Sequence, residues 1–278
     1  GGLFSLSLAS TAAAEVRSLA LSESVELALE NNRSIKSSVT DVDAADWAYH
    51  EARRTAGPKL TLSTQGNRVG GKAYRMYDHD YAYRSAAELS FPLYTGGRIE
   101  HGIEAARYGV NTADLALEST KQAVRYQTTG QYFKALEYRN LIKVGEMSVA
   151  NLKSHLDNVN AQYRVGTVAR SDVLASQVSL ANAEQSLVNV TNNYDVAIAG
   201  LNKLIGLPTG TALSLADELA YKKYDLTLDD CTAYALAHRA DGIAADLAVR
   251  QANASMEATR GASLPQVSAA ATRTIGGD

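Results

Sequence analysis

Most of the apolar residues that mark one face from Ser22 to about Ala56 are three or four positions apart. This spacing is typical of one face of an α-helix. The residues on this face are Val25, Leu29, Ile35, Val39 and Val42. Because Ser22 can act as an N-cap and Gly57-Pro58 ends the pattern, the sequence predicts one helix of moderate length over this stretch.

From Lys59 the pattern changes to alternation, and two alternating segments predict a β-hairpin over residues 59–94. In the second segment the odd positions are mostly apolar: Tyr81, Tyr83, Ala87, Leu89, Phe91 and Leu93. The even positions between them include Arg84, Glu88 and Ser90. Since successive side chains of a strand point to opposite sides, each strand has one apolar and one polar face.

Strands of about ten residues with this alternation build transmembrane β-barrels, with lipid outside and water in the lumen. Under that interpretation Arg84 and Glu88 line the lumen. The lipid-facing residues are then Tyr81, Tyr83, Leu89, Phe91 and Leu93. A half-buried hairpin of a soluble domain has the same pattern, so the hairpin alone leaves both interpretations open.

Helical spacing returns after Gly97 and continues to about Tyr163. About 65 residues at a rise of 1.5 Å span about 100 Å, and such a long apolar repeat favours a coiled-coil partner. The same spacing resumes from Leu187 to Leu204. We therefore predict a long antiparallel helical hairpin over residues 97–206, with Gly166, Thr167 and Val168 at its tip.

The beginning of the chain is repeated 207 positions later, where Leu21 matches Leu228, Arg53 matches Arg260 and Pro58 matches Pro265. We expect residues 15–225 to form a first structural repeat of helix, β-hairpin, helical hairpin and polar connector. Residues 226–278 then begin a second repeat that is truncated after its helix and first strand. A repeat of this length is a duplicated multi-element unit rather than a short-period solenoid array.

Composition narrows the function classes. The formal net charge is -3 and the charged residues are not gathered in a basic patch, so nucleic acid is not an expected partner. Residues 1–14 fit the end of a secretory signal peptide or, alternatively, a disordered terminal segment. The sequence has no run of about 18 apolar residues, so any contact with a bilayer is expected to use strands.

Catalytic and metal-binding patterns are not found in the sequence, because the five histidines are scattered singly and the lone cysteine, Cys231, has no partner. We expect no enzyme activity, no metal site and no cofactor. Near the tip, Arg164, Arg170 and Asp172 gather charge at the narrow end of the hairpin. Asp172 either complements the dipole of the returning helix or joins ion pairs that constrict a pore.

Four features together resemble the TolC-type outer membrane efflux proteins, and the likeness runs from about Val16 to the end of the chain. The features are FPLYTGGR at 91–98, a Gly and an Asp six positions apart near the tip, LNKLIGLP at 201–208, and the twofold copy that begins with ALENN. No single motif is specific, but their order and spacing are.

The resemblance implies a mainly α-helical fold of long antiparallel coiled-coil hairpins that form an α-barrel tunnel, with strands of an oligomeric transmembrane β-barrel. It implies a homotrimer in the outer membrane with a long periplasmic portion. It also implies that a periplasmic adaptor touches the tip at Val165, Gly166, Thr167 and Val168. By the same resemblance Asp172, with Arg170 beside it, belongs to the entrance gate.

The function implied is a passive export duct in a tripartite efflux or type I secretion system, supplied by an inner-membrane pump. Oligomerisation also follows from the residues, because two hairpins cannot close a barrel and open strand edges are not tolerated in lipid. The alternative is a soluble periplasmic coiled-coil scaffold or adaptor protein whose hairpins are ordinary sheet.

Overall fold

The computed structural model describes residues 17–68, 81–221 and 223–277. The expected signal peptide remnant at 1–14 therefore lies outside the described residues. The chain forms two compact units: Gly1–Lys36 with Thr120–Leu226, and Ser37–Ser119 with Thr227–Asp278. We call them unit 1 and unit 2, and the long helix α4 (Arg98–Arg164) contributes to both.

The first helical stretch is divided in two, which differs from the single helix expected from its pattern. Helix α1 (Leu21–Asn31) ends at Asn32, whose backbone is extended, and α2 (Arg33–Arg54) follows directly. The Asn32 side chain accepts a hydrogen bond from Ser34 N–H at 2.9 Å and donates one to the Leu204 carbonyl at 3.0 Å. Asn32 therefore competes with the helical hydrogen bonds locally, as Asn side chains do at helix ends.

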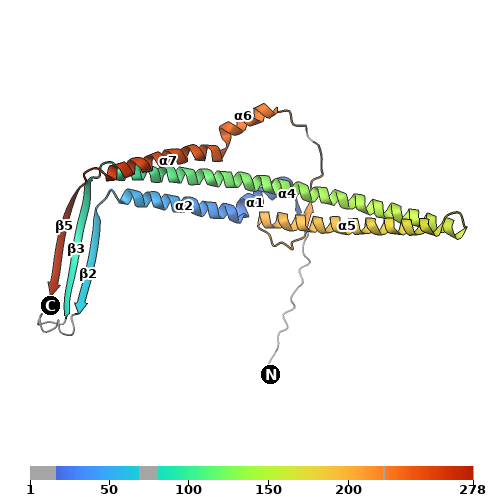
Figure 1. The fold of residues 1–278 in the computed structure, drawn as a ribbon, viewed down its shortest axis with the longest axis horizontal. Coiled ribbons are helices and arrows are strands. Elements are labelled where there is room, and N and C mark those ends of the chain that lie inside the picture. The colour runs from blue at the N-terminus through green and yellow to red at the C-terminus, as the bar shows by residue number, and fades with distance from the viewer. Residues whose placement is uncertain (1–16, 69–80, 222, 278) are drawn as a thin grey trace, which may run out of the picture. The chain divides into compact units, whose positions relative to one another are not determined.

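The helical hairpin consists of α4 and α5 (Arg170–Ile205), which reverse direction at the tip (Figure 1). Within unit 1 the two helices touch directly. Gln131 on α4 donates a hydrogen bond to the Ala197 carbonyl of α5 at 2.9 Å. A Cβ at Gly145 would lie 3.0 Å from Leu187 Cδ1, so a small residue allows close packing there. Helix α5 ends at Gly206 in the left-handed conformation, with φ 80°.

Unit 1 also contains a short parallel pair, β1 (Arg17–Leu19) with β4 (Leu213–Leu215). The sequence predicts only a polar connector after the helical hairpin, so strand β4 is a difference. Its alternate residues Leu213 and Leu215 are buried beside Leu19. Three residues are too few for alternation to be recognised in the sequence, and pairing with a distant strand is what orders them.

Unit 2 contains a three-stranded antiparallel sheet in the order β2 (Lys59–Arg68), β3 (Tyr81–Tyr94), β5 (Val267–Gly277). Its helices include α6 (Leu228–His238) and α7 (Ala240–Ala262). Gly261 of α7 has space for no side chain, because a Cβ there would lie 2.6 Å from the Gly96 carbonyl oxygen. This close approach packs the end of α7 against the joint between β3 and α4.

Over the described ranges, no helix combines the length and apolar content needed to cross a bilayer.

Candidate functional site

The hairpin tip is a five-residue turn between α4 and α5. Gly166 adopts φ +79°, a conformation that favours glycine and allows the sharp reversal. Both the backbone N–H and the hydroxyl of Thr167 donate to the Gln162 carbonyl at 3.0 Å. Val165 is 74% exposed. Hydrogen bonds within the turn therefore stabilise it, and the apolar side chain of Val165 is exposed to solvent. Val168 lies two residues before α5 begins.

Asp172 lies in the first turn of α5, where its Oδ2 accepts a hydrogen bond from Ala169 N–H at 3.1 Å. Ser176 donates to the Asp172 carbonyl at 2.9 Å. In the part of the chain that the structure describes, no ion pair joins Asp172 to Arg164 or Arg170. The carboxylate thus caps α5 here and remains exposed.

The sheet of unit 2 has one mostly apolar face and one polar face, with Thr64, Ser85 and Arg273 as polar residues on the mostly apolar face. On one face, Leu62 pairs with Ala87 and Leu60 pairs with Leu89. Of the expected lipid-facing residues, this face holds Tyr81, Tyr83, Leu89 and Phe91, whereas Leu93 lies in the strand irregularity between Pro92 and Tyr94. All five are 42–61% exposed. Its apolar surface is therefore not covered within the described chain.

The opposite face carries the expected lumen residues. Arg84 lies across from Gln65 on β2, and Glu88 lies between Thr61 on β2 and Thr272 on β5. These paired residues, Gln65, Thr61 and Thr272, carry hydroxyl or amide side chains, so this face is hydrophilic. Strands β2 and β5 are the outer strands of the described sheet, and each has one edge without a described partner.

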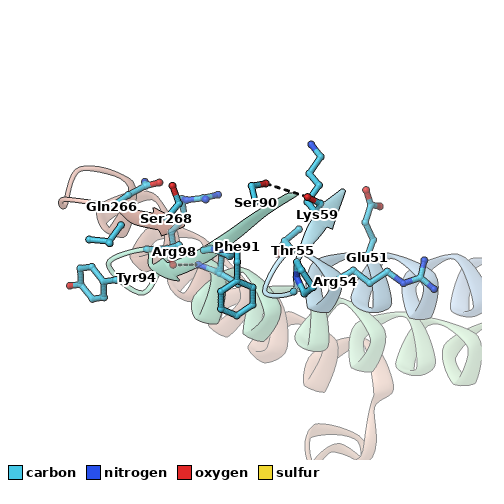
Figure 2. Close-up of a pocket in the computed structure, with 16 residues that line it drawn as sticks. Glu51, Arg54, Thr55, Lys59, Ser90, Phe91, Tyr94, Arg98, Gln266 and Ser268 are labelled. Atoms are coloured by element: carbon cyan, nitrogen blue, oxygen red, sulfur yellow. Dashed lines mark hydrogen bonds between the residues drawn. The ribbon is translucent and has the colours of Figure 1, made fainter. Parts of the chain in front are cut away.

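A pocket of about 670 Å³ lies where this sheet meets the helices of unit 2 (Figure 2). We call it the junction pocket. Its lining comes from the end of α2 and the start of β2, from the end of β3 and the start of α4, and from the start of β5. Its charged residues are Glu51, Arg54, Lys59 and Arg98. Sequence reasoning missed this pocket, although the basic residues on both sides of the hairpin were a visible signal.

A buried polar cluster joins the two short strands of unit 1 to α4. The hydroxyl of Tyr132, which is fully buried, lies 2.8 Å from Asp217 Oδ2 and 3.0 Å from the Leu19 carbonyl oxygen. Leu21 N–H donates to the same Asp217 oxygen at 2.7 Å. Arg139 donates to the carbonyls of Leu215 and Asp217 at 2.7 and 2.6 Å.

This cluster shifts two pKa values. Burial raises the pKa of Tyr132 to about 12, and its hydrogen bond to Asp217 acts in the same direction. The Leu21 N–H, followed by the Tyr132 hydroxyl, lowers the pKa of Asp217. The cluster therefore holds a neutral phenol against a charged carboxylate. Sequence reasoning missed it, because Tyr132 and Asp217 are 85 residues apart.

No group of three or more histidine, cysteine, aspartate or glutamate side chains suited to a metal ion occurs among the described residues.

Comparison with known proteins gives one consistent family. Residues 24–207 match the family described as outer membrane efflux protein. The Escherichia coli K12 outer membrane protein TolC is 31% identical over 147 residues, which cover 52% of this chain and 30% of TolC. The Cupriavidus metallidurans cobalt-zinc-cadmium resistance protein CzcC is 21% identical over 188 residues, covering 68% of this chain and 42% of CzcC.

The fold is also that of a solved structure. A crystal structure of CusC, described in terms of folding and transmembrane channel formation, matches with a TM-score of 0.75 at 18% identity. The match covers 92% of this chain and 60% of the CusC chain. The chain thus spans less than half the length of TolC and CzcC and under two thirds of CusC.

Proposed function

This chain belongs to the outer membrane efflux protein family, and we propose that it contributes one wall segment to a passive export duct between periplasm and exterior. Under this proposal the duct is a homotrimer of the longer protein. An inner-membrane pump and a periplasmic adaptor deliver its substrates, as in tripartite efflux or type I secretion. The chain itself contributes passage rather than a chemical step, in keeping with the channel and efflux proteins it resembles.

The observation that carries this proposal is the two-faced sheet with unpaired outer edges. An exposed apolar face is unfavourable in water, whereas lipid tails cover it without loss. The outer strands β2 and β5 need further strands, since a bilayer supplies no hydrogen-bond partners for their edges. Neighbouring strands from other protomers would satisfy these edges and place Arg84 and Glu88 in a water-filled lumen.

The helical hairpin supports the periplasmic half of the proposal. We infer that α4 and α5 form part of a tunnel wall, because many of their large apolar side chains remain exposed in the single chain. Val188 and Val196 of α5 are 52% and 70% exposed, and Tyr126 of α4 is 80% exposed. Contact with further helices would bury such side chains.

At the tip we propose that the turn Val165–Val168 is the adaptor contact and that Asp172, with Arg170, contributes to the entrance gate. The 74% exposure of Val165 supports the first role. For the second role, Asp172 keeps an exposed carboxylate while capping α5, so it can accept a donor from a neighbouring helix without losing its cap.

Planar-bilayer recording tests the duct, using the protein purified from outer membranes. We expect discrete conductance steps, and a Glu88→Lys variant should shift the ion selectivity toward anions, because charges lining a pore set its selectivity. Leu62→Thr, on the opposite face, is the control and should leave selectivity unchanged. Recovery of the protein from the soluble periplasmic fraction with no conductance would favour the coiled-coil scaffold instead.

A further inference from the structure

Arg273 interrupts the mostly apolar face of the sheet. It pairs with Ala87 of β3, whose other partner is Leu62 of β2, so these three residues form one row across the strands. The Arg273 side chain is exposed and joins no ion pair with another described residue. On this face of the described strands, Arg68 is the other charged residue and no acidic residue occurs. The charge that this face carries is therefore positive.

Two hydroxyl groups lie in the next row of the same face. Thr64 of β2 pairs with Ser85 of β3, and their hydroxyl oxygens are 3.1 Å apart. Ser85 also pairs with Ile275 of β5, which places it diagonally to Arg273. Diagonal neighbours in a sheet are about 7–8 Å apart, a distance that a long side chain can span. Thr64, Ser85 and Arg273 thus form one polar spot, which we call the Arg273 patch.

The Arg273 patch lies nearer to one end of the apolar face than to the other. Counted along β3, Ala87 is four positions from Tyr83, about 14 Å, and seven positions from Tyr94, about 24 Å. Tyr81 and Tyr83 stack with ring centroids 6.4 Å apart and are 52% and 43% exposed. Tyrosines gather at membrane interfaces, where an arginine costs far less than at the midplane. Arg273 can extend toward this tyrosine end, as long basic side chains do.

We propose that the Arg273 patch binds the phosphate headgroup of an anionic lipid in the exterior leaflet, with the acyl chains along the apolar rows from Leu62 to Phe91. This inference rests on the proposed function, which places this face in a bilayer and the helices in the periplasm. Because β3 leads into α4 at Tyr94, the Tyr83 end of the strand then faces the exterior. Headgroup donors and acyl-chain surface lie on the same face of the sheet.

Phosphate chemistry suits the donors of the patch. A guanidinium can donate two parallel hydrogen bonds to phosphate oxygens, and each hydroxyl can donate one more. A basic residue near a membrane surface also attracts anionic headgroups. One exposed arginine holds a free phosphate ion only weakly, because salt screens it and the side chain must be ordered. The bilayer itself keeps lipid headgroups next to the patch, so a lipid needs no comparable affinity.

Quenching of tryptophan emission by brominated lipids can measure which lipid occupies the patch. The reporter is Phe91→Trp in the complete protein, because Phe91 lies on the apolar rows where the acyl chains of a bound lipid would run. The same protein without this substitution gives the background emission, to which Trp47, the only tryptophan of this chain, contributes. Both proteins are reconstituted into mixed vesicles of phosphatidylcholine and phosphatidylglycerol, with one of the two lipids brominated.

We expect the reporter to show about fivefold preference for phosphatidylglycerol at low salt. Arg273→Gln should reduce the preference to about one. The matched control is Arg84→Gln, which removes the same charge from the opposite, polar face of the same sheet and should keep the preference. Circular dichroism should show that both variants retain their secondary structure.

Four results would overturn the proposal. An unchanged preference in Arg273→Gln would locate the lipid elsewhere, and an equal loss in Arg84→Gln would assign the preference to net charge. Loss of the preference in millimolar inorganic phosphate would make a free phosphate the ligand. Equal quenching by both lipids in the parent would remove the patch but leave the sheet in the bilayer. If neither brominated lipid quenches the reporter, this face does not contact lipid and the proposed function fails as well.

Discussion

Helices α1 and α6 begin 207 positions apart, have 11 residues each, and differ in what they bury. Each is followed by one extended residue, Asn32 or Arg239, and then by a longer helix. In α1, Ser24 and Ala28 are fully buried, whereas α6 has no buried residue. The counterparts of these two residues in α6 are Cys231 and Ala235.

The local geometry of the two helices is nearly the same. Asn32 N–H donates to the Ala28 carbonyl and Arg239 N–H to the Ala235 carbonyl, both at 2.9 Å. The difference arises because α1 packs against α5, and Asn32 extends this contact by its bond to Leu204. Thus a similar pattern makes a similar helix in both places, and burial depends on whether a partner helix covers it.

The strongest way to test this comparison is to place a charge at the equivalent position of each helix. Ala28→Asp should lower the free energy of unfolding by about 3 kcal/mol or more, since a carboxylate would be buried without a partner. Ala235→Asp should cost about 1 kcal/mol or less, mostly through lower helix propensity. Urea unfolding followed by circular dichroism measures both, and equal losses would contradict the role given to α5.

The buried cluster of unit 1 should respond strongly to loss of one hydroxyl. Tyr132→Phe removes the hydroxyl that lies within hydrogen-bond distance of both Asp217 and the Leu19 carbonyl, so we expect a loss of about 2 kcal/mol in the free energy of unfolding. Tyr234→Phe on α6 is the matched control, because Tyr234 is 67% exposed. Its expected effect is below about 0.5 kcal/mol. A stable Tyr132→Phe variant would show that the cluster does not hold unit 1 together.

The carboxylates that cap α5 and α6 offer a third comparison. Asp172 accepts from Ala169 N–H, and Asp230 accepts from both the hydroxyl and the N–H of Thr227. Replacing either by Ala should cost its helix about 1 kcal/mol or less, measured by urea unfolding. Only Asp172→Ala should also raise single-channel conductance in the complete protein, if Asp172 contributes to the gate. Unchanged conductance would leave Asp172 with capping alone.

The smallest expected effect is a shift in acid stability. Because the pKa of Asp217 is lower in the folded chain than in the unfolded one, its contribution to stability is present above about pH 4 and is lost as the pH falls through the lowered folded value. Asp217→Asn should therefore flatten the decline in stability below pH 4. Asp229→Asn, an exposed position in the first turn of α6, should leave that decline as steep as in the parent.

Much of the architecture could be read from local patterns. The long helices, the alternation of β2 and β3, and Gly166 at the reversal all depend on hydrogen bonds or backbone conformations set within a few residues. The order of the family's motifs could be read in the same way, and it led to the outer membrane efflux proteins before any coordinates. For the candidate site, local reasoning identified the tip turn and the two faces of β3.

The sequence by itself determined where the long helices and the strands of the hairpin form and which family the chain resembles, because these follow from periodicity, turn residues and motif spacing. Only the tertiary structure decided the break at Asn32, the pairing of β1 with β4, the contact of Tyr132 with Asp217, and the junction pocket. Each of these depends on groups far apart in the chain, such as Asn32 and Leu204, whose sequence positions differ by 172. No local sequence pattern specifies such long-range contacts, because the packing of whole helices and strands brings the partners together.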